Sequence, residues 1–150
     1  MNLSGMLVNH VLISTLIAWA TAQVIKVPLE YLRKHRWMWG LLLTTGGMPS
    51  SHSALIVGVT NAIGLYIGYD SPLFALGFAI AMIVTYDSAG IRRQAGMHAE
   101  RINVLFEELL KGHMWDEEEL REVRGPTPLE VTGGIWWGIV VTTLIWLFWN

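Results

Sequence analysis

Cysteine is absent from this sequence of 150 residues, and charged residues make up only 15% of it. Without cysteine, the chain has no disulfide framework, no thiolate nucleophile and no cysteine-based metal site. Soluble proteins carry charge on about a quarter of their residues, so a soluble domain fits poorly. The net charge of −2 gives no reason to expect a nucleic-acid partner. The five histidines do not fall at a spacing typical of zinc ligands.

Long apolar runs are abundant instead, and 53% of the residues are hydrophobic. A helix needs about 20 apolar residues to cross a bilayer. We therefore predict an all-α, polytopic membrane helical bundle with about four spans, at about residues 6–27, 50–69, 72–86 and 127–148. No internal repeat or linker divides the chain, so residues 1–150 are predicted to form a single integral membrane domain.

Local signals mark the boundaries of several elements. Ser71 followed by Pro72 is typical of a helix N-cap with proline at the first helical position. The spacing of Thr127 and Glu130 predicts a capping box. The apolar run from Gly40 to Met48 is short and ends near two glycines, which predicts a re-entrant or interfacial segment. The run from Asp87 to Gly112 predicts an amphipathic helix on the cytoplasmic side.

The basic residues predict the orientation in the membrane. All ten Lys and Arg residues lie in segments that alternating spans bring to one face. The positive-inside rule makes this face cytoplasmic, so we expect a multi-pass protein of the cell (inner) membrane with both termini outside. Glycine-rich faces and eight tryptophans favour a homo-oligomer, most simply a symmetric dimer.

Three polar clusters fall on the basic face. The first is Lys26 with Arg33, and the other two are the runs at residues 46–53 and 87–100. A glycine turn before a helix, as at 46–53, presents free N–H groups to an anion. Arg and Lys bind phosphate oxygens, and His attacks phosphorus or protonates a leaving oxygen. Together the clusters predict a metal-free site for phosphoryl transfer.

Each cluster also has a simpler interpretation. Lys26 and the basic run at 33–36 are typical of a topology anchor. Ser50 is typical of a helix cap, and Arg92 and Arg93 are typical of a helix held against anionic headgroups. We favour the phosphate site because the three clusters coincide on one face.

A family resemblance rests on three runs, at residues 46–54, 87–103 and 127–131. These runs resemble the divergent branch of the type 2 phosphatidic acid phosphatase family, which is related to acid phosphatases and vanadium haloperoxidases. The parent signature begins with Lys, six residues and Arg-Pro; Lys26 and Arg33 match, and Lys34 replaces the Pro. Its second part, Pro-Ser-Gly-His, reads Pro-Ser-Ser-His at 49–52.

The third part of the signature is Ser-Arg, five residues, His, three residues and Asp. Arg92 and His98 match it, while Ile91 and Ile102 replace the Ser and the Asp. The resemblance implies that His98 is the nucleophile and forms a phosphohistidine. It also implies that His52 is the general acid that protonates the leaving alkoxide.

The remaining roles follow from the same resemblance. Because Ile102 cannot orient His98, our candidate replacement for the family Asp is Asp87, with Glu100 second. No metal or other cofactor is implied. The phosphate-binding residues would be Lys26, Arg33, Gly47, Ser50, Ser51 and Arg92, with Arg93 beside them.

The sequence thus predicts a membrane-embedded phosphatase that acts at the cytoplasmic face on a lipid phosphate or an isoprenoid phosphate or diphosphate. The alternative is a non-catalytic lipid-phosphate-binding membrane protein or scaffold that keeps the pocket without the reaction. A small subunit of a transport complex is disfavoured, because no ionisable residue lies near the middle of a predicted span.

Overall fold

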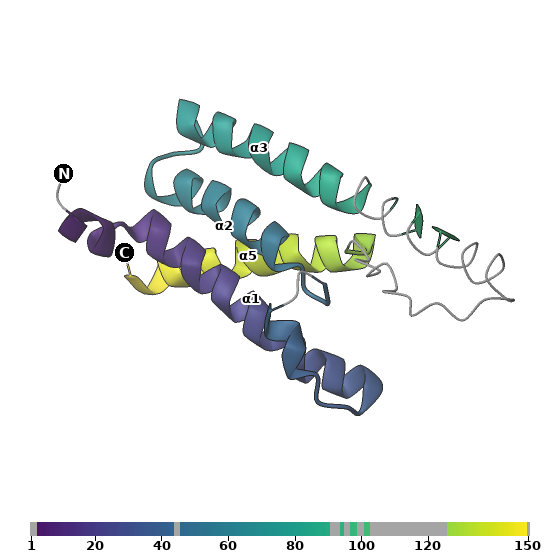
Figure 1. Cartoon of the computed structure of the whole chain (residues 1–150). Helices are drawn as coiled ribbons and strands as arrows, with labels where there is room; N and C mark the ends of the chain where they lie inside the picture. Colours follow the sequence, from purple (N-terminus) through teal and green to yellow (C-terminus); the bar gives the residue numbers. More distant parts are fainter. Residues whose placement is uncertain are drawn as a thin grey trace, which may run out of the picture.

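The computed structural model describes residues 3–43, 46–90, 94, 97–98, 101–102 and 126–149, and every regular element among them is helical. In chain order these elements are η1 (Leu3–Val8), α1 (His10–Lys34), η2 (Trp39–Leu43), α2 (Ser51–Tyr66), α3 (Pro72–Ala89) and α5 (Pro128–Trp149) (Figure 1). In this part of the chain, three helices are long and apolar enough to cross a membrane: His10–Leu32 within α1, then α3 and α5. The prediction of a helical membrane bundle is confirmed.

Three helices differ in length from their predicted spans, and one of them, α3, continues to Ala89, beyond its predicted end at about residue 86. α2 has 16 residues and therefore rises about 24 Å, which is less than the roughly 30 Å of the hydrocarbon core. α1 is longer than predicted, because it continues through Pro28 to Lys34. Lys26 consequently lies inside a helix and not at its end. The amphipathic helix predicted at 87–112 lies mostly outside the described residues.

Capping side chains hold two helix starts where the sequence predicts them. The Ser71 hydroxyl accepts a hydrogen bond of 3.2 Å from the N–H of Phe74, at the start of α3. The Thr127 N–H donates to the Glu130 carboxylate at 2.9 Å, and the Glu130 N–H donates to the Thr127 hydroxyl at 3.3 Å. The second pair is the predicted capping box, and it fixes where α5 enters the bundle.

Contacts at the two ends of the bundle show how the helices alternate in direction. At the end that holds both termini, the His10 ring lies 5.4 Å from the Tyr66 ring and 5.0 Å from the Trp149 ring. At the opposite end, the Ser50 N–H donates to the Glu130 carbonyl at 2.8 Å; we call this the basic end. α2 therefore runs antiparallel to both α1 and α5, with the N and C labels on the same side in Figure 1.

Small residues at every fourth position let the three central helices pack closely. All of them are buried: Ser14, Ala18 and Ala22 on α1, Ala54, Gly58 and Ala62 on α2, and Gly134, Gly138 and Thr142 on α5. A Cβ added at Gly138 would lie 2.7 Å from the Ala54 carbonyl oxygen. The backbones of α2 and α5 are thus in contact, as small residues permit in membranes.

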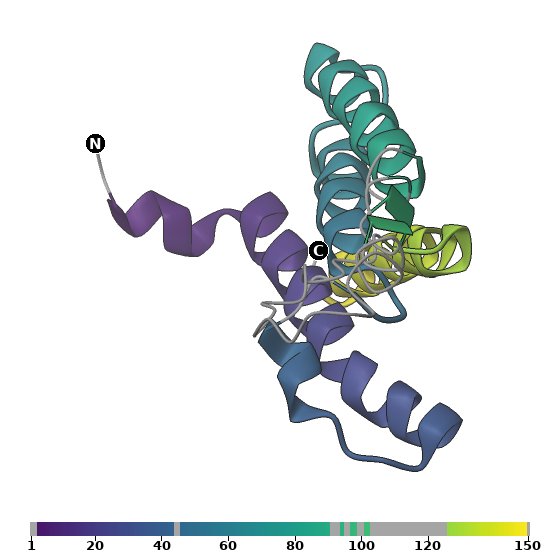
Figure 2. The same cartoon turned by 45° about the vertical axis from the view of Figure 1, so that its right-hand side comes forward.

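α3 packs on α2. A Cβ added at Gly77 would lie 3.3 Å from the Thr60 hydroxyl oxygen, so α3 approaches α2 closely there. Figure 2 shows α3 beside α2, and η2 beside the C-terminal half of α1. Because a short turn joins α2 to α3, α3 returns along α2 and ends at the basic end.

Replacing Gly138 by alanine is expected to lower the free energy of unfolding by about 1–3 kcal/mol, the usual cost of overpacking. The nearest neighbours of the added methyl group are backbone atoms of Ala54 and Gly58, which cannot rotate away as a flexible side chain can. Denaturant unfolding in detergent measures the change. Gly5→Ala is the matched control, because a Cβ there meets nothing within 4 Å. Equal stability of the two variants would contradict the close packing of α2 and α5.

Candidate functional site

Lys26 is the largest fully buried side chain of the described residues, with 0% of its surface exposed. Its ammonium donates to the Gln23 side-chain oxygen at 2.9 Å and to the Ser51 hydroxyl at 3.1 Å. Both acceptors are neutral. A buried charge is costly unless an opposite charge pairs with it, so the environment of Lys26 favours an anion.

No carboxylate of the described residues lies at ion-pair distance from the Lys26 ammonium. The one ion pair found in the described part of the chain joins Glu30 to Lys34, at 2.6 Å. The negative charge of Glu130 attracts Lys26 from beyond ion-pair distance. The Glu130 carboxylate accepts a hydrogen bond from the N–H of Thr127. The hydrogen bonds of the Lys26 ammonium therefore go to neutral groups, and its charge has no ion-pair partner in this part of the chain.

The glycine turn before α2 lies over the stem of Lys26. Gly47 has a φ of 91°, a left-handed conformation that favours glycine. A Cβ added there would lie 3.7 Å from Cδ of Lys26. Ser50 is buried, and its hydroxyl accepts hydrogen bonds from the N–H and the hydroxyl of Ser53. The turn therefore delivers the positive N-terminal end of α2 to the Lys26 ammonium.

Four predicted site residues thus come together from α1, the glycine turn and α2: Lys26, Gly47, Ser50 and Ser51. Two predicted catalytic residues belong to the same end of the bundle. His52 lies in the first turn of α2 and Asp87 in the last turn of α3, and both side chains are partly buried. Each has an interaction partner of its own. Whether these residues bind phosphate or catalyse its transfer stays a prediction.

The other predicted residues lie near the end of α1 and in the segment that follows α3. Arg33 lies in α1, seven residues after Lys26. His98 is helical and its side chain is exposed. Arg92, Arg93 and Glu100 lie outside the described residues, so the predicted grouping around His98 stays a prediction.

Gln23 and Glu130 lie beside the predicted site residues, Gln23 bonded to Lys26 and Glu130 bonded to Ser50, although the sequence did not single them out for this. The Gln23 amide donates to the carbonyls of Leu42 at 2.7 Å and Leu41 at 3.3 Å, which joins η2 to α1. The available signal was a polar residue in an apolar span, three positions before Lys26 and thus on the same helix face. Glu130 was predicted only as a helix cap, and nothing in its spacing indicates its proximity to Lys26.

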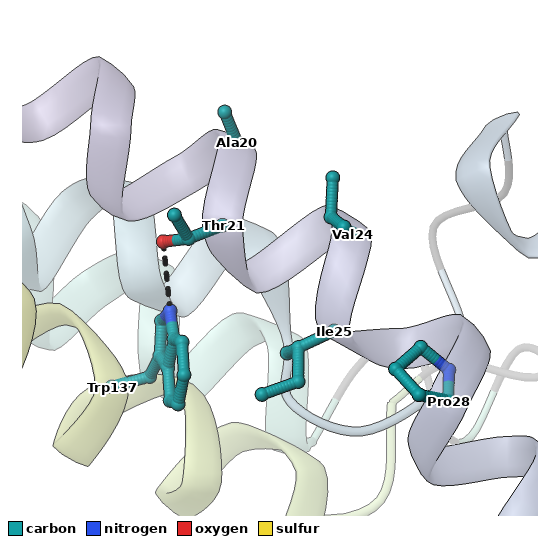
Figure 3. Close-up of a pocket in the computed structure, with 6 residues that line it drawn as sticks. All are labelled: Ala20, Thr21, Val24, Ile25, Pro28 and Trp137. Carbon is teal, nitrogen blue, oxygen red and sulfur yellow. Dashed lines mark hydrogen bonds between the residues drawn. The ribbon is translucent and has the colours of Figure 1, made fainter.

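An apolar groove of about 410 Å³ runs along the outside of α1, beside α5 (Figure 3). The indole N–H of Trp137 donates to the Thr21 hydroxyl at 3.1 Å, so these two polar groups satisfy each other. The remaining wall is hydrocarbon. The residues that line the groove are Ala20, Thr21, Val24, Ile25, Pro28 and Trp137.

Metal ligands were not predicted from the sequence. Within the described ranges, no group of three or more His, Asp or Glu side chains is arranged to hold a metal ion. The expectation of metal-free chemistry remains a prediction.

Comparison with known proteins gives two matches. The profile of the family described as "Divergent PAP2 family" matches residues 7–141. The chain is also 36% identical to an uncharacterized membrane protein, YuiD, of Bacillus subtilis (strain 168), over 95% of this chain and 98% of that protein. No solved structure matches the chain significantly. The matched region includes Lys26, the glycine turn and both predicted catalytic histidines.

Proposed function

The chain belongs to the Divergent PAP2 family, and on this basis we propose that it is a membrane-embedded phosphatase. Its substrate is a lipid phosphate or an isoprenoid phosphate or diphosphate. The observation that carries the proposal is the Lys26 ammonium, which is fully buried against Ser51 and the turn at Gly47. A phosphate group supplies the negative charge that this buried ammonium favours.

In the proposed reaction, His98 attacks phosphorus and forms the N–P bond of a phosphohistidine while the P–O bond to the leaving alkoxide breaks. His52 donates its proton to that alkoxide. Water then attacks phosphorus and gives a proton to His52, which restores the general acid, while the N–P bond breaks and inorganic phosphate leaves. Asp87 orients His98 and stabilises its positive charge. Lys26 and the helix start stabilise the charge on the phosphate oxygens in the transition state.

The surroundings of the basic end support a lipid substrate. The rings of Tyr31 and Trp37 stack with centroids 4.5 Å apart, and Trp37 stacks on Trp39 at 5.5 Å. Aromatic rings gather at the depth of lipid headgroups, where a lipid phosphate lies. The groove beside α1 offers an apolar path for a hydrocarbon tail whose headgroup lies at the basic end.

The basic residues at the end of α1 indicate the orientation of the protein in the membrane. Lys34 and Arg36 are exposed just beyond the membrane-spanning part of α1. Under the positive-inside rule, the basic end faces the cytoplasm. The phosphate site then opens to the cytoplasmic leaflet of the cell membrane, and both termini lie outside.

The proposal is tested by phosphate release from purified full-length protein over a panel of lipid phosphates, with and without a chelator. We expect release from long-tailed substrates to exceed release from soluble short-chain analogues by at least about tenfold, because each buried CH₂ contributes about 0.8 kcal/mol. We expect the chelator to have no effect. Release that vanishes with the chelator would contradict the metal-free mechanism. Binding of phosphate without any release would favour the non-catalytic alternative.

A further inference from the structure

The side chain of Gln23 connects Lys26 to a segment outside the central helices. Its oxygen accepts a hydrogen bond of 2.9 Å from the Lys26 ammonium. Its nitrogen donates to the carbonyl oxygens of Leu42 at 2.7 Å and Leu41 at 3.3 Å, at the end of η2. The oxygen of one amide group therefore binds Lys26, the residue proposed to bind phosphate, and the nitrogen of the same amide binds η2.

This bridge has consequences for the ammonium itself. A lysine ends in three N–H donors on a flexible four-carbon stem. Bonds to Gln23 and Ser51 fix two of these donors, and so set the direction of the third. An amide held by two backbone carbonyls is itself restricted in rotation. Two neutral acceptors consequently hold the Lys26 ammonium in one orientation, and neither of them neutralises its charge.

The bridge also reaches the glycine turn. A Cβ added at Gly47 would lie 3.6 Å from a methyl carbon of Leu41. Leu41 thus packs against the turn, while its carbonyl accepts from Gln23. The position of η2 relative to α1 therefore affects both the Lys26 ammonium and the turn that leads into α2.

We infer that Gln23 is the positioning residue of the phosphate site: it orients Lys26 and fixes η2 against the glycine turn. This inference rests on the proposed function, because it gives Gln23 a role in binding phosphate through Lys26. Gln23 does not contact the phosphate. A neutral amide is required there, since a carboxylate at the same position would itself become the counter-ion of Lys26.

Two substitutions separate this role from simple packing. Gln23→Met keeps the length and the helix propensity but loses the three hydrogen bonds of the amide, to Lys26, Leu41 and Leu42. We expect it to weaken binding of inorganic phosphate by about tenfold or more, the usual effect of losing a hydrogen bond to a charged group. Gln23→Glu keeps an acceptor for Lys26 and adds a competing negative charge. We expect it to weaken phosphate binding further than Gln23→Met does.

The experiment is calorimetric titration of the full-length protein in detergent with inorganic phosphate. Thr15→Val is the matched control, because the Thr15 hydroxyl is also on α1 but bonds to the Val11 carbonyl of its own helix. We expect wild-type affinity for Thr15→Val. Because the chain has no native cysteine, the substitution Leu42→Cys introduces a single thiol whose labelling rate measures how exposed η2 is. Its labelling by a soluble maleimide should accelerate in both Gln23 variants.

The outcomes distinguish the two proposals. Wild-type affinity in Gln23→Met would overturn the positioning role while leaving the proposed function intact. Equal affinities of Gln23→Met and Gln23→Glu would show that Gln23 only holds η2, and would also overturn it. A wild-type protein that binds neither inorganic phosphate nor a lipid phosphate would overturn the proposed function, and the positioning role with it.

Discussion

Replacing His98 by alanine is expected to abolish phosphate release from a lipid phosphate. Removal of a covalent nucleophile costs on the order of 10⁶ in turnover, which places the variant at background. Because His98 is exposed, the substitution removes no buried packing, and we expect the unfolding transition to stay where it is. His52→Ala is expected to reduce turnover by about 10²–10⁴-fold, since it removes a general acid and not the nucleophile. Release of inorganic phosphate under substrate saturation measures both losses.

The control for these variants is His35→Asn. His35 is an exposed histidine at the same end of the bundle and ends α1 at a φ of 52°, a conformation that asparagine tolerates. It has no role in the proposed chemistry, so its turnover should equal that of the wild type. Unchanged turnover in both His98→Ala and His52→Ala would contradict the phosphohistidine mechanism. Loss of turnover with phosphate binding retained is the pattern that the mechanism predicts.

Replacing Lys26 by methionine is expected to remove phosphate binding and turnover while leaving the protein as stable as before, or more stable. The ammonium is fully buried, and the energy of desolvating it opposes folding as long as no anion pairs with it. Methionine fills nearly the same volume without the charge. Residues that bind a ligand often lower the stability of the protein without that ligand. Thermal unfolding in detergent, without added phosphate, measures the effect on stability.

Lys34→Met is the matched control for charge and length on the same helix. The side chain of Lys34 is 59% exposed and pairs with Glu30, a type of ion pair that contributes little to stability. We expect wild-type turnover within about twofold, because the exposed charge of Lys34 is largely screened by solvent. Strong destabilisation by Lys26→Met, with turnover retained per folded molecule, would indicate a purely structural lysine.

The helical fold was predictable because its signals are local. Apolar run lengths predicted the three helices that are long enough to cross a membrane, and Ser71 and Thr127 predicted two helix starts that the hydrogen bonds confirm. The length of α1 was not predictable, because Pro28 suggests an end while the helix continues past it. The contact between α2 and α5 joins residues far apart in the sequence, such as Ala54 and Gly138, and no local pattern shows which helices meet.

The candidate site was predictable in part, because the motifs of the family are short runs of sequence. The family resemblance identified Lys26, Gly47 and the serines of the α2 start, and the structure brings these residues together. The role of Gln23 was not predicted, because its partners in η2 are backbone carbonyls. Backbone groups are the same in every residue, so no sequence motif indicates them. Glu130 escaped notice because its capping role was a sufficient explanation of its spacing. Arg92, Arg93 and Glu100 lie outside the described part of the chain, so their grouping around His98 rests on the resemblance.

The proposed function depends above all on phosphate binding by the Lys26 ammonium at the basic end. The most direct measurement is calorimetric titration of the purified full-length protein with inorganic phosphate, for the wild type, Lys26→Met and Lys34→Met. We expect saturable binding to the wild type and to Lys34→Met, and none to Lys26→Met. Equal binding to all three proteins would contradict this expectation, and so would the absence of binding to the wild type.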